Sequence, residues 1–147
     1  MVRCWAKVAV HAAETESAVV VPAREEAPWK ETYPIEQWHS ENYANHYMNV
    51  AARQLGGWEL PLDWHFGPLA FRAQHAHLWL DADGELWDAQ CTPVVAAIKA
   101  GLKVTSVEVD FRASLAMKAE EEGDLDFVEK RLMQINFLDP KIKAAWA

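Results

Sequence analysis

The stretch Asn45-His-Tyr-Met-Asn-Val50 decides the fold that the sequence predicts. Asn45 is of a residue type that caps helices, and a helix that begins there would end at the glycine pair of residues 56–57. Ser40 is a second candidate for the start of this helix, and it would place His46 in the helix interior. With Asn45 as the cap, His46 is the first helical residue.

A hairpin is predicted further along the chain. Residues 73–81 (Ala-Gln-His-Ala-His-Leu-Trp-Leu-Asp) and residues 85–89 each predict a strand. Asp83-Gly84 between them indicates a tight turn, because this pair accepts positive φ angles. In such a hairpin the two strands face each other, so His77 and Asp88 are expected to pair on one face of the sheet.

Together these segments predict the framework of a thiol acyl-transfer site. Such chemistry needs a nucleophile whose anion is stabilised at a helix N-terminus, a histidine that takes its proton, and a carboxylate that orients the histidine. His77 and Asp88 would supply the second and third groups. His46 stands where the thiol is expected.

The order of these motifs resembles small papain-like or transglutaminase-like domains of phages and bacteria, over roughly residues 42–92. That family carries a cysteine with a nearby asparagine at a helix start, then Gly-Trp or Gly-Tyr, then His-[Ala/Ser]-Trp-Leu, Asp-Gly, and an acidic residue before a threonine. The matching positions here are His46, Asn49, Gly57-Trp58, His77, Trp79-Leu80, Asp83-Gly84, Asp88 and Thr92. The resemblance implies a papain-like fold in which His46 replaces the cysteine.

The resemblance also implies roles for these residues. His77 would be the general base, Asp88 would orient it, and Asn49 would present its amide to the site. Three nucleophiles stay open: Ser40, in a second register that uses residues 40–44; Cys91, which is close to Asp88 in the sequence; or a metal-bound water.

A zinc site is a further candidate. His75 and His77 are two residues apart and would share one face of a strand. With His46 and Asp88 they would offer three imidazoles and a carboxylate, which are ligands that zinc accepts. Apart from this candidate zinc site, no cofactor is expected. Among the aromatic residues, Trp38, Trp64 and Trp79 are the candidates for contact with a substrate or partner.

The rest of the chain completes a prediction of one α+β domain, residues 1–147, with a mostly antiparallel sheet, a central helix and C-terminal helices. Residues 2–10 and 18–21 predict strands of an N-terminal hairpin (residues 1–21), and residues 22–40 an irregular segment. Residues 58–60 predict a short strand, 92–101 a helix and 102–112 a strand. Residues 115–122 and 125–137 predict helices within a C-terminal helical region, residues 114–138.

Composition limits the classes of function. The formal net charge is −8, which argues against nucleic-acid binding because that needs a basic face. The two cysteines, Cys4 and Cys91, are too few for a disulfide framework and favour a reducing compartment. Neither a signal peptide nor a membrane span is indicated. We expect a cytoplasmic protein, in the host cytoplasm if it is phage-encoded.

Three functions follow from these features, and they leave open whether the protein is an enzyme. The retained His77 and Asp88 favour an atypical or degenerate acyl-transfer or amide-hydrolysis domain. The absent cysteine and the negative charge favour a non-catalytic, acidic phage-type protein that binds a host protein complex. The third is a zinc-binding protein. A protein or peptide partner is expected rather than a small molecule.

Overall fold

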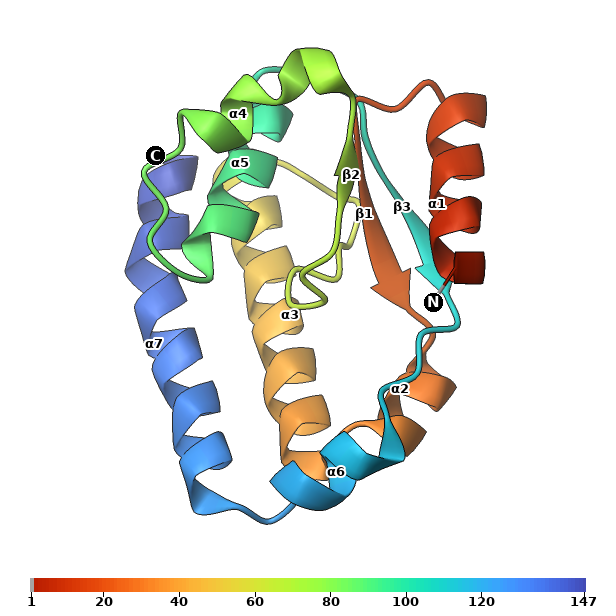
Figure 1. Cartoon of the computed structure of the whole chain (residues 1–147). Coiled ribbons are helices and arrows are strands. Elements are labelled where there is room, and N and C mark those ends of the chain that lie inside the picture. The colour runs from red at the N-terminus through yellow and green to blue at the C-terminus, as the bar shows by residue number, and fades with distance from the viewer. Residues whose placement is uncertain (1) are drawn as a thin grey trace.

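The computed structural model describes residues 2–147 and has an α+β architecture, as the sequence predicts (Figure 1). In chain order the elements are α1 (Val2–Glu14), β1 (Val19–Arg24), α2 (Glu26–Thr32), α3 (Ile35–Gly56), β2 (Ala70–Phe71), a 3-10 turn (Ala73–His75), α4 (His77–Leu80), α5 (Asp88–Lys99), β3 (Val104–Val109), α6 (Leu115–Glu121) and α7 (Leu125–Trp146).

The three described strands form one small mixed sheet in the order β2-β1-β3. β1 pairs with β3 in parallel along its whole length, from Val19 opposite Val104 to Arg24 opposite Val109. Its antiparallel pairing with β2 covers only two residue pairs. The prediction of a mostly antiparallel sheet is therefore wrong. The parallel pair is sterically accessible because the segment from α2 to α5 serves as a long crossover.

The sheet separates two apolar cores. Alternate residues of a strand face opposite sides, so Val19 and Val21 enter the larger core while Val20 faces the smaller one. Helices α3, α5 and α7 cover the larger core, and α1 lies on the other face of the sheet (Figure 1). This two-sided burial explains the unbroken valine run of β1.

The N-terminal hairpin that the sequence predicts is wrong, because residues 2–14 form α1. Cys4, Val8 and Ala12 recur every fourth residue and lie on the side of α1 that packs on the sheet. Val8 is buried against Val20 and Val109. The alternating pattern of residues 2–10 is also compatible with a helix. The helix forms because its apolar side packs on the exposed face of the sheet.

Helix α3 begins at Ile35, directly after Pro34, and not at Ser40 or Asn45. Part of the segment predicted as irregular, residues 22–40, thus forms α2 and the first turns of α3. The predicted end of α3 is confirmed. Gly57 has a φ of 63° and ends the helix in the left-handed conformation.

The hairpin predicted over residues 73–89 is also wrong. The chain forms a 3-10 turn, the short helix α4 and a loop, and α5 already begins at Asp88. The Asp88 carboxylate accepts hydrogen bonds from the backbone N–H groups of Glu85 and Leu86 just before the helix. Residues 58–60, predicted as a strand, are irregular.

The C-terminal half follows the prediction more closely. β3 and α6 lie within the predicted segments, and α7 extends beyond the predicted end at residue 137 to Trp146. Helices α3 and α7 run parallel, because Glu41 contacts Arg131, Tyr47 bonds to Asp139 and Gly56 meets Trp146. No helix in residues 2–147 has the length and apolarity that a membrane crossing requires.

Candidate functional site

The structure does not place His46 at a helix start. His46 is an exposed residue in the middle of α3, more than two turns after Ile35. The backbone N–H groups around it already belong to the helix, so they are not free to stabilise an anion. The prediction that Asn45 caps this helix and that His46 is its first residue is therefore wrong.

His77 and Asp88 lie in different surroundings. His77 is exposed at the start of α4, with Nδ1 3.2 Å from the backbone oxygen of Gln74. Asp88 is 1% exposed. Its Oδ2 lies 3.5 Å from Lys141 Nζ. Burial acts to raise the pKa of Asp88, but the N–H of Leu86 and the Lys141 ammonium outweigh it and lower the pKa. The hairpin that would have paired His77 with Asp88 is not formed.

Ser40 and Asn49 have local structural partners. Ser40 Oγ donates to the backbone oxygen of Gln37 one turn earlier in α3, at 3.1 Å. The Asn49 amide holds the backbone of Leu62, accepting from its N–H at 2.9 Å and donating to its oxygen at 3.0 Å. Asn49 Oδ1 also accepts from Trp64 Nε1 at 2.9 Å. Asn49 therefore attaches the chain after α3 to that helix.

Cys91 is a buried thiol on α5. Its side chain is 3% exposed. Its Sγ lies 3.7 Å from the backbone oxygen of Trp64. Burial, helped by the nearby Asp88 carboxylate, raises the pKa of the Cys91 thiol to about 12. Because the thiolate is the reactive form, this position makes Cys91 a poor nucleophile.

Residues 2–147 contain no group of three His, Cys, Asp or Glu side chains arranged to hold a metal ion. The rings of His75 and His77 are 6.4 Å apart, and His46 belongs to a different element. The three predicted tryptophans differ. Trp64 is buried, Trp38 packs on Trp29 and His39, and Trp79 stacks on Phe71 with ring centroids 4.0 Å apart.

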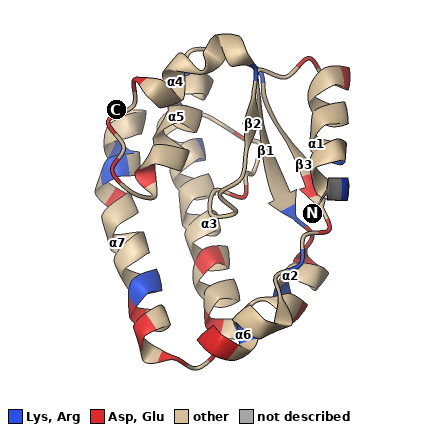
Figure 2. Cartoon of the chain, viewed as in Figure 1, with Lys and Arg blue, Asp and Glu red and all other residues tan. Residues whose placement is uncertain are grey.

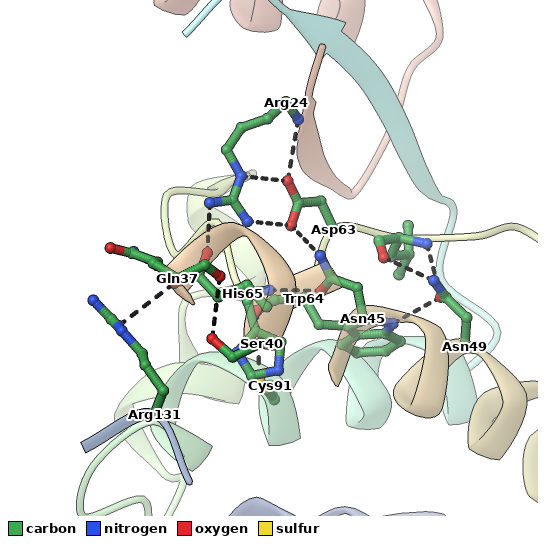
Figure 3. A network of polar contacts seen from close by, with 12 residues as sticks. Arg24, Gln37, Ser40, Asn45, Asn49, Asp63, Trp64, His65, Cys91 and Arg131 are labelled. Carbon is green, nitrogen blue, oxygen red and sulfur yellow. Dashed lines mark hydrogen bonds and ion pairs between the residues drawn. The ribbon is translucent and has the colours of Figure 1, made fainter. Parts of the chain in front are cut away.

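The strongest polar cluster of the fold surrounds Arg24, the last residue of β1 (Figure 3). Its guanidinium donates to both oxygens of Asp63, each at 2.8 Å, and to Glu41 Oε2 at 2.6 Å. The Arg24 backbone N–H also donates to Asp63, at 3.1 Å. Side-chain exposure is 1% for Arg24, 7% for Asp63 and 5% for Glu41. This is a buried, bidentate ion-pair network.

Helix α3 supplies the polar residues that complete the network. Asn45 donates to Asp63 at 2.7 Å and accepts from the backbone N–H of His65 at 3.0 Å. Gln37 donates to Glu41 Oε1 at 2.7 Å, and Arg131 of α7 approaches the same oxygen at 3.5 Å. Glu41, Asn45 and Asn49 follow one another at four-residue spacing, which puts them on one face of the helix.

Aromatic rings enclose the Arg24 guanidinium. Its central carbon lies 3.9 Å from the centroid of Trp29, 5.2 Å from that of Phe66 and 5.3 Å from that of Tyr33. Burial acts to lower the pKa of Arg24, but Asp63 and Glu41 outweigh it and raise the pKa above its ordinary value. Arg24 is therefore a fixed positive charge inside the protein.

His65 is a second perturbed group beside the network. Its Nε2 is buried and has no hydrogen-bond partner in the described structure. Burial is the main cause that lowers the pKa of His65 to about 4, and Arg24 and Arg131 act in the same direction against the opposing Asp63. The ring is therefore neutral at pH 7.

Asp63 is the most completely hydrogen-bonded carboxylate of the network. Asp63 accepts hydrogen bonds from three nitrogens of Arg24 and one of Asn45, which uses the acceptor positions of both its oxygens. A cavity of about 350 Å³ adjoins it and is lined by Trp29, Asn45, Asp63, Ser106 and Glu108 among others. Because both oxygens of Asp63 are fully used, the network favours a structural role. It joins β1, α3, α7 and the loop at Asp63.

Arg24, Glu41 and Asp63 are not among the site residues that the sequence predicts. One available signal was the four-residue spacing of Glu41, Asn45 and Asn49 on a helix that also carries Ala44, Met48 and Ala52. Polar residues at that spacing on a helix face that is otherwise apolar indicate a buried polar contact. The partners Arg24 and Asp63 gave no comparable local signal.

A second candidate site is the surface that we call the α7 patch, formed by Tyr43, Leu125, Leu132 and Met133. Their exposed fractions are 67%, 66%, 57% and 64%. Two contacts between α3 and α7, Glu41 with Arg131 and Tyr47 with Asp139, show which parts of the two helices lie side by side. Tyr43 of α3 lies between these two contacts. Leu132 and Met133 of α7 also lie between them. The two parallel helices thus present these side chains at the same height.

Acidic residues adjoin the α7 patch. Figure 2 shows acidic positions gathered where α6 meets α7. The ion pairs of this corner, Lys118 with Glu122 and Arg131 with Glu121, leave out the exposed Asp126 and Glu129. The surface therefore combines large apolar side chains with the exposed carboxylates of Asp126 and Glu129, next to the exposed Lys130.

The chain matches no protein-family model, no curated protein and no solved structure. The resemblance to papain-like domains consequently stays a prediction.

Proposed function

We propose that the protein is a non-catalytic binding protein whose α7 patch engages a basic segment with an apolar face on a partner protein. The observation that carries the proposal is the exposure of Leu132 and Met133, at 57% and 64%, beside the acidic end of α7. Single exposed apolar residues are common, but several large ones on two packed helices are typical of an interaction surface.

The apolar side chains would supply most of the affinity. Leu125 and Leu132 are seven residues apart and share one side of α7, Met133 lies about 100° further round the helix, and Tyr43 lies at the neighbouring level of α3. Binding energy in protein interfaces comes mainly from a few such side chains that become desolvated at the centre of the contact. Methionine also adapts its shape to irregular partner surfaces.

The charge of the surface selects the partner. Asp126 and Glu129 lie at the start of α7, and the chain has a formal net charge of −8. Opposite charge on a partner accelerates encounter and disfavours acidic competitors. A Lys- or Arg-rich segment that also carries leucine-like side chains fits both features.

A catalytic function has less support. His46 is not at a helix start, the predicted pairing element of His77 and Asp88 is absent, and Cys91 is buried with a raised pKa. The buried network around Arg24 leaves no free carboxylate oxygen on Asp63 to act as a base. An exposed, pre-formed surface needs none of these groups.

The proposal can be tested with a synthetic amphipathic helical peptide that has lysine on one face and leucine on the other. Fluorescence anisotropy would compare the wild type, the Leu132→Ser/Met133→Ser variant and the control Leu86→Ser, which changes a residue that is 57% exposed near α5. Loss of two central apolar contacts is expected to weaken binding by about 10- to 100-fold, at more than about 1 kcal/mol each. The control is expected to bind as the wild type does.

Charge is tested separately with Asp126→Asn/Glu129→Gln. This variant is expected to bind the basic peptide more weakly at low salt and with a smaller salt dependence. The proposal is wrong if the wild type does not bind the peptide, or if the Leu132→Ser/Met133→Ser and Leu86→Ser variants bind it equally well.

A further inference from the structure

Helix α1 carries more apolar surface than the sheet covers. Its buried side consists of Cys4, Val8, His11 and Ala12, which face the strands. Its solvent side carries the exposed apolar residues Trp5, Ala6, Ala9, Val10 and Ala13, of which Trp5 is 39% and Val10 is 54% exposed, and it also carries the charged residues Arg3, Lys7 and Glu14. Apolar side chains that gather on one exposed face of a helix are typical of a contact surface.

A groove lies beside this exposed face. It has a volume of about 260 Å³ and runs between the end of α1, at Ala12 and Ala13, and the strand residues Val20, Ala70 and Phe71. Ser17, Ala18 and Arg72 complete its lining, most of which is apolar. A cavity of about 150 Å³ accommodates a benzene molecule, so this groove has room for an aromatic side chain.

The charges of α1 are placed against the helix dipole. Arg3 lies in the first turn, where positive charge is unfavourable, and Glu14 is the last residue, where negative charge is unfavourable. Figure 2 shows the basic position near the start of α1 and the acidic one at its end. Within the described residues, the ion pair of α1 joins Lys7 to Glu25 at 3.9 Å. It involves neither Arg3 nor Glu14.

We propose that the exposed face of α1 packs antiparallel against α1 of a second copy of this chain, with Trp5 of each copy seated in the groove of the other. Trp5 and Ala13 lie four residues on either side of Ala9. A two-fold axis beside Ala9 therefore brings Trp5 of one copy opposite Ala13 of the other. The contact is isologous and closes as a dimer.

The same axis pairs the unfavourable charges. An antiparallel arrangement places Arg3 of each copy beside Glu14 of the other, so the negative end of each helix receives a positive charge. Around the helix axis, Arg3 and Glu14 lie to one side of the exposed apolar face. Trp5 and the groove residue Ala12 lie to its other side. A two-fold axis across the helices preserves these sides, so the apolar and charged contacts form together.

Small side chains on the exposed face of α1 allow the two helices of the dimer to pack closely. Ala6, Ala9 and Ala13 lie on the exposed face and let two helix backbones approach each other. The exposed face of α1 is therefore complementary to α1 of a second copy of the chain. A basic partner protein, as proposed for the α7 patch, would be repelled by Arg3 and Lys7 at the start of α1.

Sedimentation equilibrium of the full chain over a range of concentrations tests the proposal. The wild type is expected to dimerise, and Trp5→Ala is expected to raise the dimer dissociation constant at least about tenfold, because the indole is the central anchor. Leu86→Ala, far from α1 in the sequence and 57% exposed, is the matched control and is expected to dimerise normally.

Exchanging the charges of Arg3 and Glu14 distinguishes an effect on their contact between copies from an effect on folding. Arg3→Glu and Glu14→Arg are each expected to weaken the dimer several-fold, and the double variant Arg3→Glu/Glu14→Arg is expected to restore it. The proposal is overturned if the wild type is a monomer at every concentration, or if its dimer is unaffected by Trp5→Ala. Failure of the double variant to recover dimerisation would also overturn the antiparallel arrangement. None of these readouts depends on the basic peptide that tests the α7 patch.

Discussion

At the scale of single residues, Arg24 is the charge on which the polar interior depends. It is almost fully buried, and it forms hydrogen bonds to two buried carboxylates, those of Asp63 and Glu41. Removing one member of such a network leaves the others charged and without a partner in a poorly solvated interior. The aromatic rings around Arg24 cannot replace its hydrogen bonds.

Arg24→Met is therefore expected to lower the free energy of unfolding by about 3–5 kcal/mol, as measured by urea denaturation. Arg112→Met is the control, because Arg112 is 53% exposed and pairs with Asp110 and Glu31 at the surface. Exposed pairs contribute little, so the control is expected to unfold nearly as the wild type does. Equal losses in the two variants would contradict a stabilising role for the buried network.

His65 predicts a pH dependence of stability. Its pKa is lowered from an ordinary value of 6.5 to about 4 by burial, so the unfolded chain binds a proton that the folded chain does not. Stability is complete above about pH 6.5 and falls as the pH drops toward 4, by up to about 3 kcal/mol. The lowered pKa values of Asp88 and Asp139 act only below their ordinary value of 3.8.

The measurement is urea denaturation at several values between pH 7.5 and 4.5. His65→Gln cannot take up the proton and is expected to show a flatter dependence over this range, even if its stability at pH 7.5 is lower. An unchanged slope in His65→Gln would show that another group causes the loss. The slope, and not the absolute stability, is the test.

At the scale of elements, the parallel pair α3 and α7 has one point of very close approach. A Cβ on Gly56 would lie 2.2 Å from the Trp146 ring, which is closer than atoms can pack. Gly56 therefore has a different function from its neighbour Gly57, which has a φ of 63° and no neighbouring atom within 4 Å of a Cβ. One glycine allows helix contact, and the other ends the helix.

Gly56→Ala is expected to destabilise the protein by about 1–3 kcal/mol through overpacking, despite the better helix propensity of alanine. The double variant Gly56→Ala/Trp146→Leu is expected to lose less stability than the two single changes combined, because the smaller side chain removes the clash. Gly57→Asn is the control, since asparagine tolerates the left-handed conformation. Additive effects in a thermal-denaturation cycle would show that Gly56 and Trp146 do not interact.

The elements that sequence reasoning assigned incorrectly share a cause. Residues 2–10 and 73–81 both contain alternating apolar residues that also fit a helical spacing. A short segment with both patterns takes the conformation that its tertiary neighbours favour. Residues 115–122 and 125–137 have only the helical pattern, and they form α6 and the first part of α7.

At the scale of the whole molecule, the C-terminal end of α7 completes the larger core. Leu138, Ile142 and Trp146 are buried there at 3%, 1% and 6% exposure, against α3 and α5. All three lie beyond residue 137, where the sequence pattern places the end of the helix. The last turns of the chain are thus part of the core and not an appendage.

A chain that ends at residue 137 is expected to lose cooperative thermal unfolding by circular dichroism, because it exposes the apolar surfaces of α3 and α5. A chain that ends at Trp146 lacks only the exposed Ala147 and is expected to melt as the full chain does. Retention of a sharp transition in the shorter chain would show that α7 beyond residue 137 is dispensable.

The sequence by itself determined the α+β class, the end of α3 at Gly57, the strand β3, the C-terminal helices and the acidic balance of the chain. These features depend on local rules: periodicity, glycine conformations and charge count. The tertiary structure alone decided the parallel pairing of β1 with β3, the helical state of residues 2–14 and the burial of Arg24 between Glu41 and Asp63. The physical reason is that each of these outcomes depends on partners distant in the chain, whose contacts outweigh the weak preferences of short segments.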